Sequence, residues 1–311
     1  MTIIIVPENA NRRLDKFLFA YLNNAPHSFI YKMLRKKRIK LNGGRAQGNE
    51  LLQNGDELRF FISEDTLAGC RKTRSFAPAK PLCGIIFEDD NLLIVNKPAG
   101  LPSHGGMAAQ DHLLARMLYY LQENGTFGVD ADFTPALCNR LDVNTSGLVV
   151  CGKNLHTLQK MNLLFASREV QKEYITIVHG VAGEIGKRRT LRDFYEKDEK
   201  ANKAHITREQ QDDEIITDFT VLAVTSGYSL LSVSPITGRS HQIRVHLASA
   251  GFPIIGDKKY GGKSTPFAAV QLLHCRKLQL PCGMAWESPL PTKFLDCINK
   301  LFGGNVAICK Q

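Results

Sequence analysis

One aspartate, Asp142, is placed where a carboxylate could do chemistry. It lies in the run Asn-Arg-Leu-Asp-Val-Asn-Thr-Ser-Gly-Leu-Val-Val at residues 139–150, with Arg140 two positions before it. Residues 148–151 form a continuous apolar run, a pattern that predicts a strand buried on both faces. Gly147 permits a sharp backbone bend just before that strand. We therefore expect Asp142 on a short, anchored loop at the rim of a core strand.

On these residues alone the loop has two interpretations. Asp142 forms a local side-chain turn with Arg140 as its surface partner, which is common for Arg-x-Asp, or it is a carboxylate held for catalysis. In either case we expect Thr145 and Ser146 to tie down loop amides with their hydroxyls.

A second run of interest lies at residues 237–248, Thr-Gly-Arg-Ser-His-Gln-Ile-Arg-Val-His-Leu-Ala. In a helix, His241, Arg244 and Leu247 would share one face because they are three positions apart. By itself, Arg244 is interpreted as a charge on a helix surface. Tyr174, near the start of the alternating strand pattern at 172–178, is by itself a half-buried packing residue.

The first run closely resembles the signature His-Arg-Leu-Asp-x-x-Thr-Ser-Gly-Leu of the RluA-type pseudouridine synthases, with Asn139 where that signature usually starts with His. The second run resembles the same family, as does the Lys-x-Tyr strand start at Tyr174. The resemblance covers nearly the whole chain and includes these further segments: residues 251–257, 260–262, 273–274 and 289–291.

This resemblance implies an enzyme that breaks the glycosidic bond of a uridine in RNA, turns the uracil and rejoins it through carbon 5. Asp142 would be the catalytic carboxylate, as nucleophile or as base, with Arg244 reaching it and Tyr174 against the uracil. The target base would leave its stack, and Arg140 would fill the vacated space. Leu141 and Ile243 would form apolar walls that exclude water from the cleaved sugar. Neither a metal nor a cofactor is implied.

Apolar surroundings would raise the pKa of the Asp142 carboxyl. An arginine at contact distance lowers a carboxyl pKa by about 1–3 units, so Arg244 would keep the group ionised. A lysine would orient the carboxylate less well.

The composition limits the classes of protein to which this chain can belong. The 311 residues suffice for one large or two unequal domains, and no segment approaches a membrane span of about 20 apolar residues. The chain start lacks the features of a signal peptide. Eight scattered cysteines with no Cys-x-x-Cys pair indicate neither a zinc site nor a redox pair, and favour a reducing cytoplasm.

The net charge of +10 is unevenly distributed. Residues 1–80 hold 15 Lys/Arg against 7 Asp/Glu, a net +8, whereas residues 81–311 hold 25 against 23, a net +2. A basic head on a nearly neutral body indicates binding to a polyanion.

Residues 10–66 are predicted to form a small domain that resembles the S-four type (αL) RNA-binding module. Helical spacing covers residues 12–22, Ser28 is the expected N-cap of a second helix, and short strands follow. A basic helix end is often only a solvated terminus favoured by the helix dipole. Here the predicted phosphate contacts are Arg35, Lys36, Lys37, Arg38 and Lys40.

Residues 67–84 are predicted to be a basic, flexible linker, and residues 85–303 a catalytic domain. The resemblance implies an α+β fold with a central mixed, mainly antiparallel sheet flanked by helices. Lys97 and His104, in a proline-stiffened loop, are expected to face the RNA. Residues 183–217 are expected to form a surface excursion without a role.

The predicted function is an RNA pseudouridine synthase acting on large-subunit ribosomal RNA, with transfer RNA as the alternative substrate. A non-catalytic RNA-binding or ribosome-assembly factor is the alternative that Asn139 favours. A glycoside hydrolase would need a second carboxylate in a matched motif, which the sequence lacks. We expect a monomer that binds RNA and neither a membrane nor a small-molecule cofactor.

Overall fold

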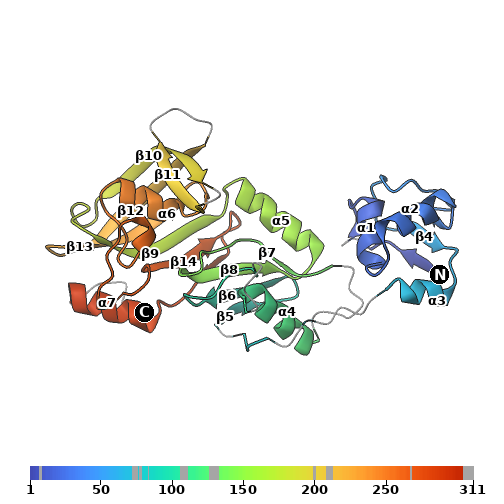
Figure 1. Cartoon of the computed structure of the whole chain (residues 1–311), viewed down its shortest axis with the longest axis horizontal. Helices are drawn as coiled ribbons and strands as arrows, with labels where there is room; N and C mark the ends of the chain where they lie inside the picture. The colour runs from blue at the N-terminus through green and yellow to red at the C-terminus, as the bar shows by residue number, and fades with distance from the viewer. Residues whose placement is uncertain are drawn as a thin grey trace.

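Two bodies with separate hydrophobic cores make up the chain (Figure 1). No described helix is long and apolar enough to cross a lipid bilayer. The computed structural model describes residues 1–6, 9–71, 76, 79–82, 84–105, 111–125, 133–198, 201–207, 213–266 and 268–303.

The N-terminal body combines three helices with a four-stranded antiparallel sheet of order β1-β4-β2-β3. Asn42 and Gly43 form a tight turn between β2 and β3 with φ of 50° and 74°, which suits a two-residue hairpin. Its elements are β1 (Thr2–Ile4), α1 (Leu14–Tyr21), α2 (His27–Arg35), β2 (Ile39–Leu41), β3 (Gly44–Arg45), β4 (Glu57–Phe60) and α3 (Glu64–Gly69).

Two expectations for this body need correction. Helix α2 begins at His27 with Pro26 at the N-cap, so Ser28 lies inside the first turn and caps nothing. The linker does not begin at residue 67, because Ser63 caps α3 and Leu67 is buried in the N-terminal core. Leu67 has apolar neighbours to pack on, which a six-residue helix needs for stability. Residues 72–75, 77–78 and 83 of the predicted linker lie outside the described residues.

The large body is built on an eleven-stranded sheet of order β11-β10-β12-β13-β9-β14-β8-β6-β5, with β7 and β15 paired at its sides. Its elements are β5 (Ile85–Glu88), β6 (Leu92–Lys97), α4 (Leu113–Glu123), β7 (Ala136–Leu137), β8 (Ser146–Gly152), α5 (Leu155–Ala166), β9 (Gln171–His179), β10 (Arg188–Asp198), β11 (Lys203–Thr207), β12 (Glu214–Val224), β13 (Tyr228–Pro235), α6 (Gln242–Ser249), the 3-10 turn η2 (Lys258–Tyr260), β14 (Leu273–Gln279), β15 (Ala285–Glu287) and α7 (Thr292–Phe302).

The predicted α+β fold with a mixed, mainly antiparallel sheet is confirmed. Among the described strands, β8 and β14 are the only parallel pair. Every residue of β8 is buried, as the apolar run predicts for a strand covered on both faces. This strand therefore gives the loop that precedes it a rigid base.

The expectation for residues 183–217 is wrong in part. The segment contributes β10, β11 and the start of β12 to the main sheet. Tyr195 and Ile215 are buried there against Val245 of α6. The charged side chains obscured the strand pattern because many of them alternate with these packed residues.

Candidate active site

Asp142 lies on the loop between β7 and β8, and that loop is anchored by Asn139. The Asn139 side-chain amide donates to the Leu148 carbonyl (3.2 Å) and its oxygen accepts from the Val150 amide (2.8 Å). Asn139 thus completes the backbone pairing of β8 at the point where the loop leaves the sheet. The residue that departs from the family signature therefore has a structural role in anchoring this loop.

A buried lysine holds the same loop from the other side. The Lys97 ammonium donates to the carbonyls of Pro98 (3.0 Å), Leu101 (2.7 Å) and Val143 (3.0 Å). Burial lowers the pKa of Lys97 to about 7, although the negative charge of Asp142 opposes that change. Lys97 is fully buried, so the expectation that it faces RNA is wrong.

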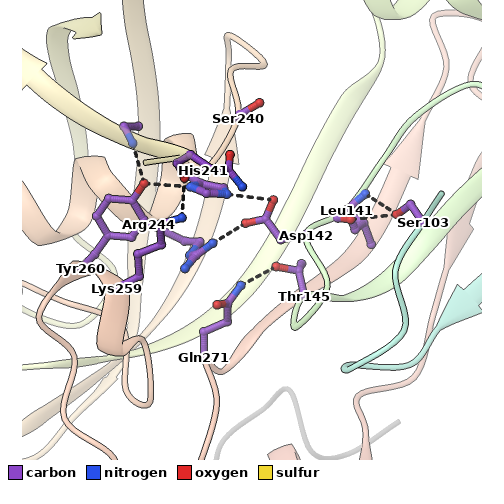
Figure 2. A network of polar contacts seen from close by, with 12 residues as sticks. Ser103, Leu141, Asp142, Thr145, Ser240, His241, Arg244, Lys259, Tyr260 and Gln271 are labelled. Carbon is purple, nitrogen blue, oxygen red and sulfur yellow. Dashed lines mark hydrogen bonds and ion pairs between the residues drawn. The ribbon is translucent and has the colours of Figure 1, made fainter. Parts of the chain in front are cut away.

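Hydroxyl groups fix the loop differently from the prediction. Thr145 accepts from the Gln271 side chain (3.0 Å), and Ser146 bonds to His274 (2.9 Å), so neither hydroxyl binds a loop amide. Ser103 does that work: its hydroxyl donates to the Leu141 carbonyl (2.8 Å) and accepts from the Leu141 amide (3.1 Å) (Figure 2).

Arg244 of α6 links Asp142 to a second carboxylate. Its Nη1 donates to Asp142 Oδ2 at 2.7 Å, while Nε and Nη2 donate to the two oxygens of Asp257 at 2.7 and 2.8 Å. Burial alone would lower the pKa of Arg244, but the two carboxylates outweigh it and raise the pKa. Asp257 is 1% exposed and Asp142 27% exposed. The guanidinium is therefore fixed on the buried side and presents its remaining nitrogen to the accessible acid.

Tyr260 and His241 complete this side of the network (Figure 2). The Tyr260 ring lies 5.0 Å from the Arg244 guanidinium, and its hydroxyl bonds to His241 Nδ1 at 2.8 Å. His241 Nε2 is 3.9 Å from Asp142 Oδ1. Burial lowers the pKa of His241, with Asp142 opposing. His241 lies at the N-cap of α6 with φ of 57°, so it precedes the helix whose face it was expected to share.

Tyr174 of β9 packs where two core clusters meet, one containing Leu141 and the other containing Ile243. Cross-strand pairing places Cys275 of β14 opposite Tyr174. Burial, then the neighbouring Cys275, raises the pKa of Tyr174 well above its usual value, and Asp142 adds to the effect. Tyr174 is thus a protonated phenol, and it lies close enough to Asp142 for the carboxylate charge to raise its pKa.

Arg140 points away from this core. Its side chain is exposed and has no hydrogen-bond or ion-pair partner among the described residues. His104 is exposed as well, and partial burial followed by the charge of Arg140 lowers the pKa of its imidazole.

The five predicted RNA contacts gather at the end of α2 and on β2. Arg35, Lys36, Lys37 and Arg38 are exposed, and Lys40 lies over the exposed ring of Phe61 at 5.3 Å. None of the five has a carboxylate within ion-pair distance in the described part of the chain. Their charge is therefore available to a polyanion.

Two residues of the site, Asp257 and Tyr260, were not predicted from the sequence to have a role. Both fall in segments that carry the family resemblance. The sequence signal that could have identified them is the run Gly256-Asp257 followed by Tyr260. Nothing near these residues in the sequence indicates that they contact Arg244. Within the described chain, no group of three or more His, Cys, Asp or Glu side chains is arranged to hold a metal ion.

The fold is that of the pseudouridine synthases. The solved structure of human RNA pseudouridylate synthase domain containing 4 matches it with a TM-score of 0.57 at 26% identity, covering 70% of this chain and 92% of that chain.

Residues 91–249 match the family described as RNA pseudouridylate synthase. Ribosomal large subunit pseudouridine synthase D of Borreliella burgdorferi is 30% identical over 310 residues, which cover 96% of this chain and 91% of that protein. Ribosomal large subunit pseudouridine synthase C of Haemophilus influenzae is 32% identical over 265 residues, 84% of this chain and 79% of that protein. The chain belongs to the RNA pseudouridylate synthase family and is an isomerase that acts on RNA.

Proposed function

We propose that this enzyme converts specific uridines of large-subunit ribosomal RNA to pseudouridine, with Asp142 as its catalytic carboxylate. The substrate class is supported by the relatives named ribosomal large subunit pseudouridine synthases C and D. One observation carries the assignment of Asp142: Arg244 binds Oδ2 at 2.7 Å, while Oδ1 accepts no hydrogen bond from a described residue. A fixed carboxylate with one free oxygen is ready to react.

The reaction breaks the bond between N1 and C1′ and forms a bond between C5 and C1′, after which the C5 proton is lost. Oδ1 of Asp142 would act at the ribose, either by attacking the sugar or by removing a ribose proton. Arg244 would serve both routes, because it holds the other oxygen in place. Asp257 would keep the guanidinium from turning away.

Tyr174 is assigned to hold the uracil by stacking. Its raised pKa keeps the phenol protonated at neutral pH, so the free enzyme has no phenolate to serve as a base. Leu141 and Ile243 would supply the apolar walls on its two sides. Arg140, exposed and unpaired in the described chain, would enter the space that the extruded base leaves.

The N-terminal body is proposed to be the S-four type RNA-binding module. Its unpaired cations at residues 35–38 and 40 would contact phosphates, which position the enzyme without reading sequence. Counterion release from those contacts offsets part of the few kcal/mol that unstacking the target base costs.

We infer further that the protein works as a monomer in the cytoplasm. Every described cysteine is unpaired, as a reducing compartment requires. Sedimentation of the purified protein with and without RNA measures its oligomeric state.

Asp142→Asn is expected to abolish pseudouridine formation and to change RNA affinity by less than a few-fold. The amide keeps the shape of the carboxylate but is neither a nucleophile nor a base. The measurement is pseudouridine mapping of large-subunit ribosomal RNA after incubation with each protein, together with filter binding.

Asp213→Asn is the matched control, because Asp213 also pairs with an arginine, Arg239, but lies outside the site. It is expected to retain activity. Turnover by Asp142→Asn would refute the role of Asp142. Pseudouridine formed in transfer RNA alone would show that transfer RNA is the substrate. If the unaltered protein formed pseudouridine in neither RNA, the proposed function would be wrong.

A further inference from the structure

The strand that carries Tyr174 also carries a cation that the mechanism above leaves unused. Lys172 lies two residues before Tyr174 on β9, so the two side chains stand on the same face of the sheet, about 7 Å apart along the strand. Lys172 is partly buried. Its ammonium has no carboxylate within ion-pair distance in the described chain.

The surroundings of Lys172 disfavour its charge. Burial lowers the pKa of this ammonium; the Cys275 thiol opposes the change, and the Arg168 guanidinium adds to it. Arg168 is exposed and likewise lacks a carboxylate partner among the described residues. Lys153, which directly follows β8, is by contrast paired with Glu88 at 3.0 Å. A cation kept in such a place without a partner costs stability, and an anion bound beside it would offset that cost.

The chain leaves space beside this ammonium. Gly238, in the segment that leads to His241 and Arg244, would place a Cβ 3.7 Å from the Lys172 Nζ. Its φ is not in the left-handed region, so the backbone does not require glycine there. What glycine provides at this position is room beside the ammonium, since no other atom lies within 4 Å of the Cβ position.

We propose that Lys172, with Arg168 beside it, binds a phosphate of the RNA strand that carries the target uridine, next to the base held by Tyr174. This inference rests on the proposed function. A lysine ammonium suits the role because it meets phosphate as a compact point charge. This contact would hold the extruded nucleotide by its phosphate. The basic N-terminal body would instead bind other phosphates of the same RNA.

The test uses Lys172→Met, which keeps most of the length of the unbranched side chain and removes its charge. With a large-subunit ribosomal RNA transcript carrying 5-tritiated uridine, tritium release reports every isomerisation. Lys172→Met is expected to raise KM about tenfold and to make the dependence of log kcat/KM on log salt less steep by about 0.7, the slope for one neutralised phosphate of a single strand. Lys172→Arg should stay within about threefold of the unaltered enzyme.

Lys277→Met is the matched control, because Lys277 lies on the adjacent strand but pairs with Glu287 at 3.3 Å. Its KM and salt slope should match those of the unaltered enzyme. Gly238→Ala is a second variant that keeps the lysine: it should raise KM by crowding the phosphate.

Thermal unfolding separates this role from a structural one. If the cation serves only RNA, Lys172→Met leaves Tm unchanged or raises it, since an unpaired buried charge has been removed. An unaltered KM and salt slope in Lys172→Met, or a fall in Tm that accounts for the reduced activity, would overturn the inference while the enzyme still makes pseudouridine. Absence of tritium release from the unaltered enzyme would instead count against the proposed function.

Discussion

Arg244 shows how much a single side chain can organise when its geometry is planar. Two of its nitrogens bind the buried Asp257 as a fork, and a third points at Asp142. A lysine could offer only one compact ammonium to the two acids. The orientation of the Asp142 carboxylate therefore depends on the shape of the guanidinium as well as on its charge.

Arg244→Lys is expected to lower kcat about 100-fold or more, the usual effect of losing one oriented charged donor at a reacting centre. The remaining ammonium would satisfy Asp257 and leave Asp142 free to rotate. Single-turnover kinetics measure the chemical step directly. Arg239→Lys, which changes an arginine paired with Asp213 at the surface, should behave as the unaltered enzyme, and equal kcat values for both variants would contradict this account.

The strand pair β8 and β14 sets the position of the active-site loop at the scale of elements. Gly147 has φ of +116°, and a Cβ there would lie 2.2 Å from the Cys275 carbonyl oxygen, so no side chain fits between these strands. Beside it, His274 of β14 is buried and bonded to the hydroxyls of Ser146 and Ser288, each at 2.9 Å. His274 thus links Ser146, where the Asp142 loop enters β8, to Ser288, the residue after β15.

Burial lowers the pKa of His274 from its usual 6.5 to about 4. The unfolded chain therefore binds a proton between these values that the folded chain does not, and stability is lost as pH falls from about 6.5 toward 4. From pH 7 to pH 5 the free energy of unfolding should fall by about 2 kcal/mol on account of this residue. Urea unfolding of the enzyme and of His274→Gln at both pH values measures the difference.

The other histidines with lowered pKa remain in both proteins, so their contribution cancels in that comparison. An equal pH dependence in the enzyme and in His274→Gln would show that the imidazole is protonated in the folded state.

At the scale of the molecule, binding and chemistry are assigned to different bodies. The N-terminal body has its own core and carries the cations at residues 35–38 and 40, whereas the large body carries Asp142, the proposed catalytic carboxylate. Charge follows the same division, with a net +8 on residues 1–80 and +2 on the remainder. Affinity for RNA and the rate of the chemical step should therefore respond to different substitutions.

Replacing the four cations at residues 35–38 by glutamine is expected to raise KM and leave kcat within about twofold, because these side chains would act before the chemical step. The salt dependence of binding should become less steep by about 0.7 to 0.9 for each phosphate that the variant no longer neutralises. Steady-state kinetics over a range of salt concentrations test both statements. Arg59→Gln, whose arginine pairs with Glu57 on the same body, should change neither, and a fall in kcat without a rise in KM would contradict the division of roles.

Patterns confined to a short stretch were predictable from the sequence. The helices at 113–123 and 155–166 follow helical spacing, and the strands at 92–97 and 146–152 contain continuous apolar runs. The run around Asp142 carries the family signature. The linker start at residue 67 and the excursion at 183–217 were wrong because Leu67 and Tyr195 are buried by partners distant in the chain.

The sequence alone thus indicated Asp142, Arg244 and Tyr174 as residues of one site, since each lies in a run that resembles the family. Tertiary structure decided what surrounds them: Asp257 behind Arg244, Lys97 buried under the loop, Asn139 tied to β8 and Lys172 left without a partner. The physical reason is that a residue's type and spacing report local geometry. Burial and charge pairing are instead set by segments that meet only when the sheet is assembled.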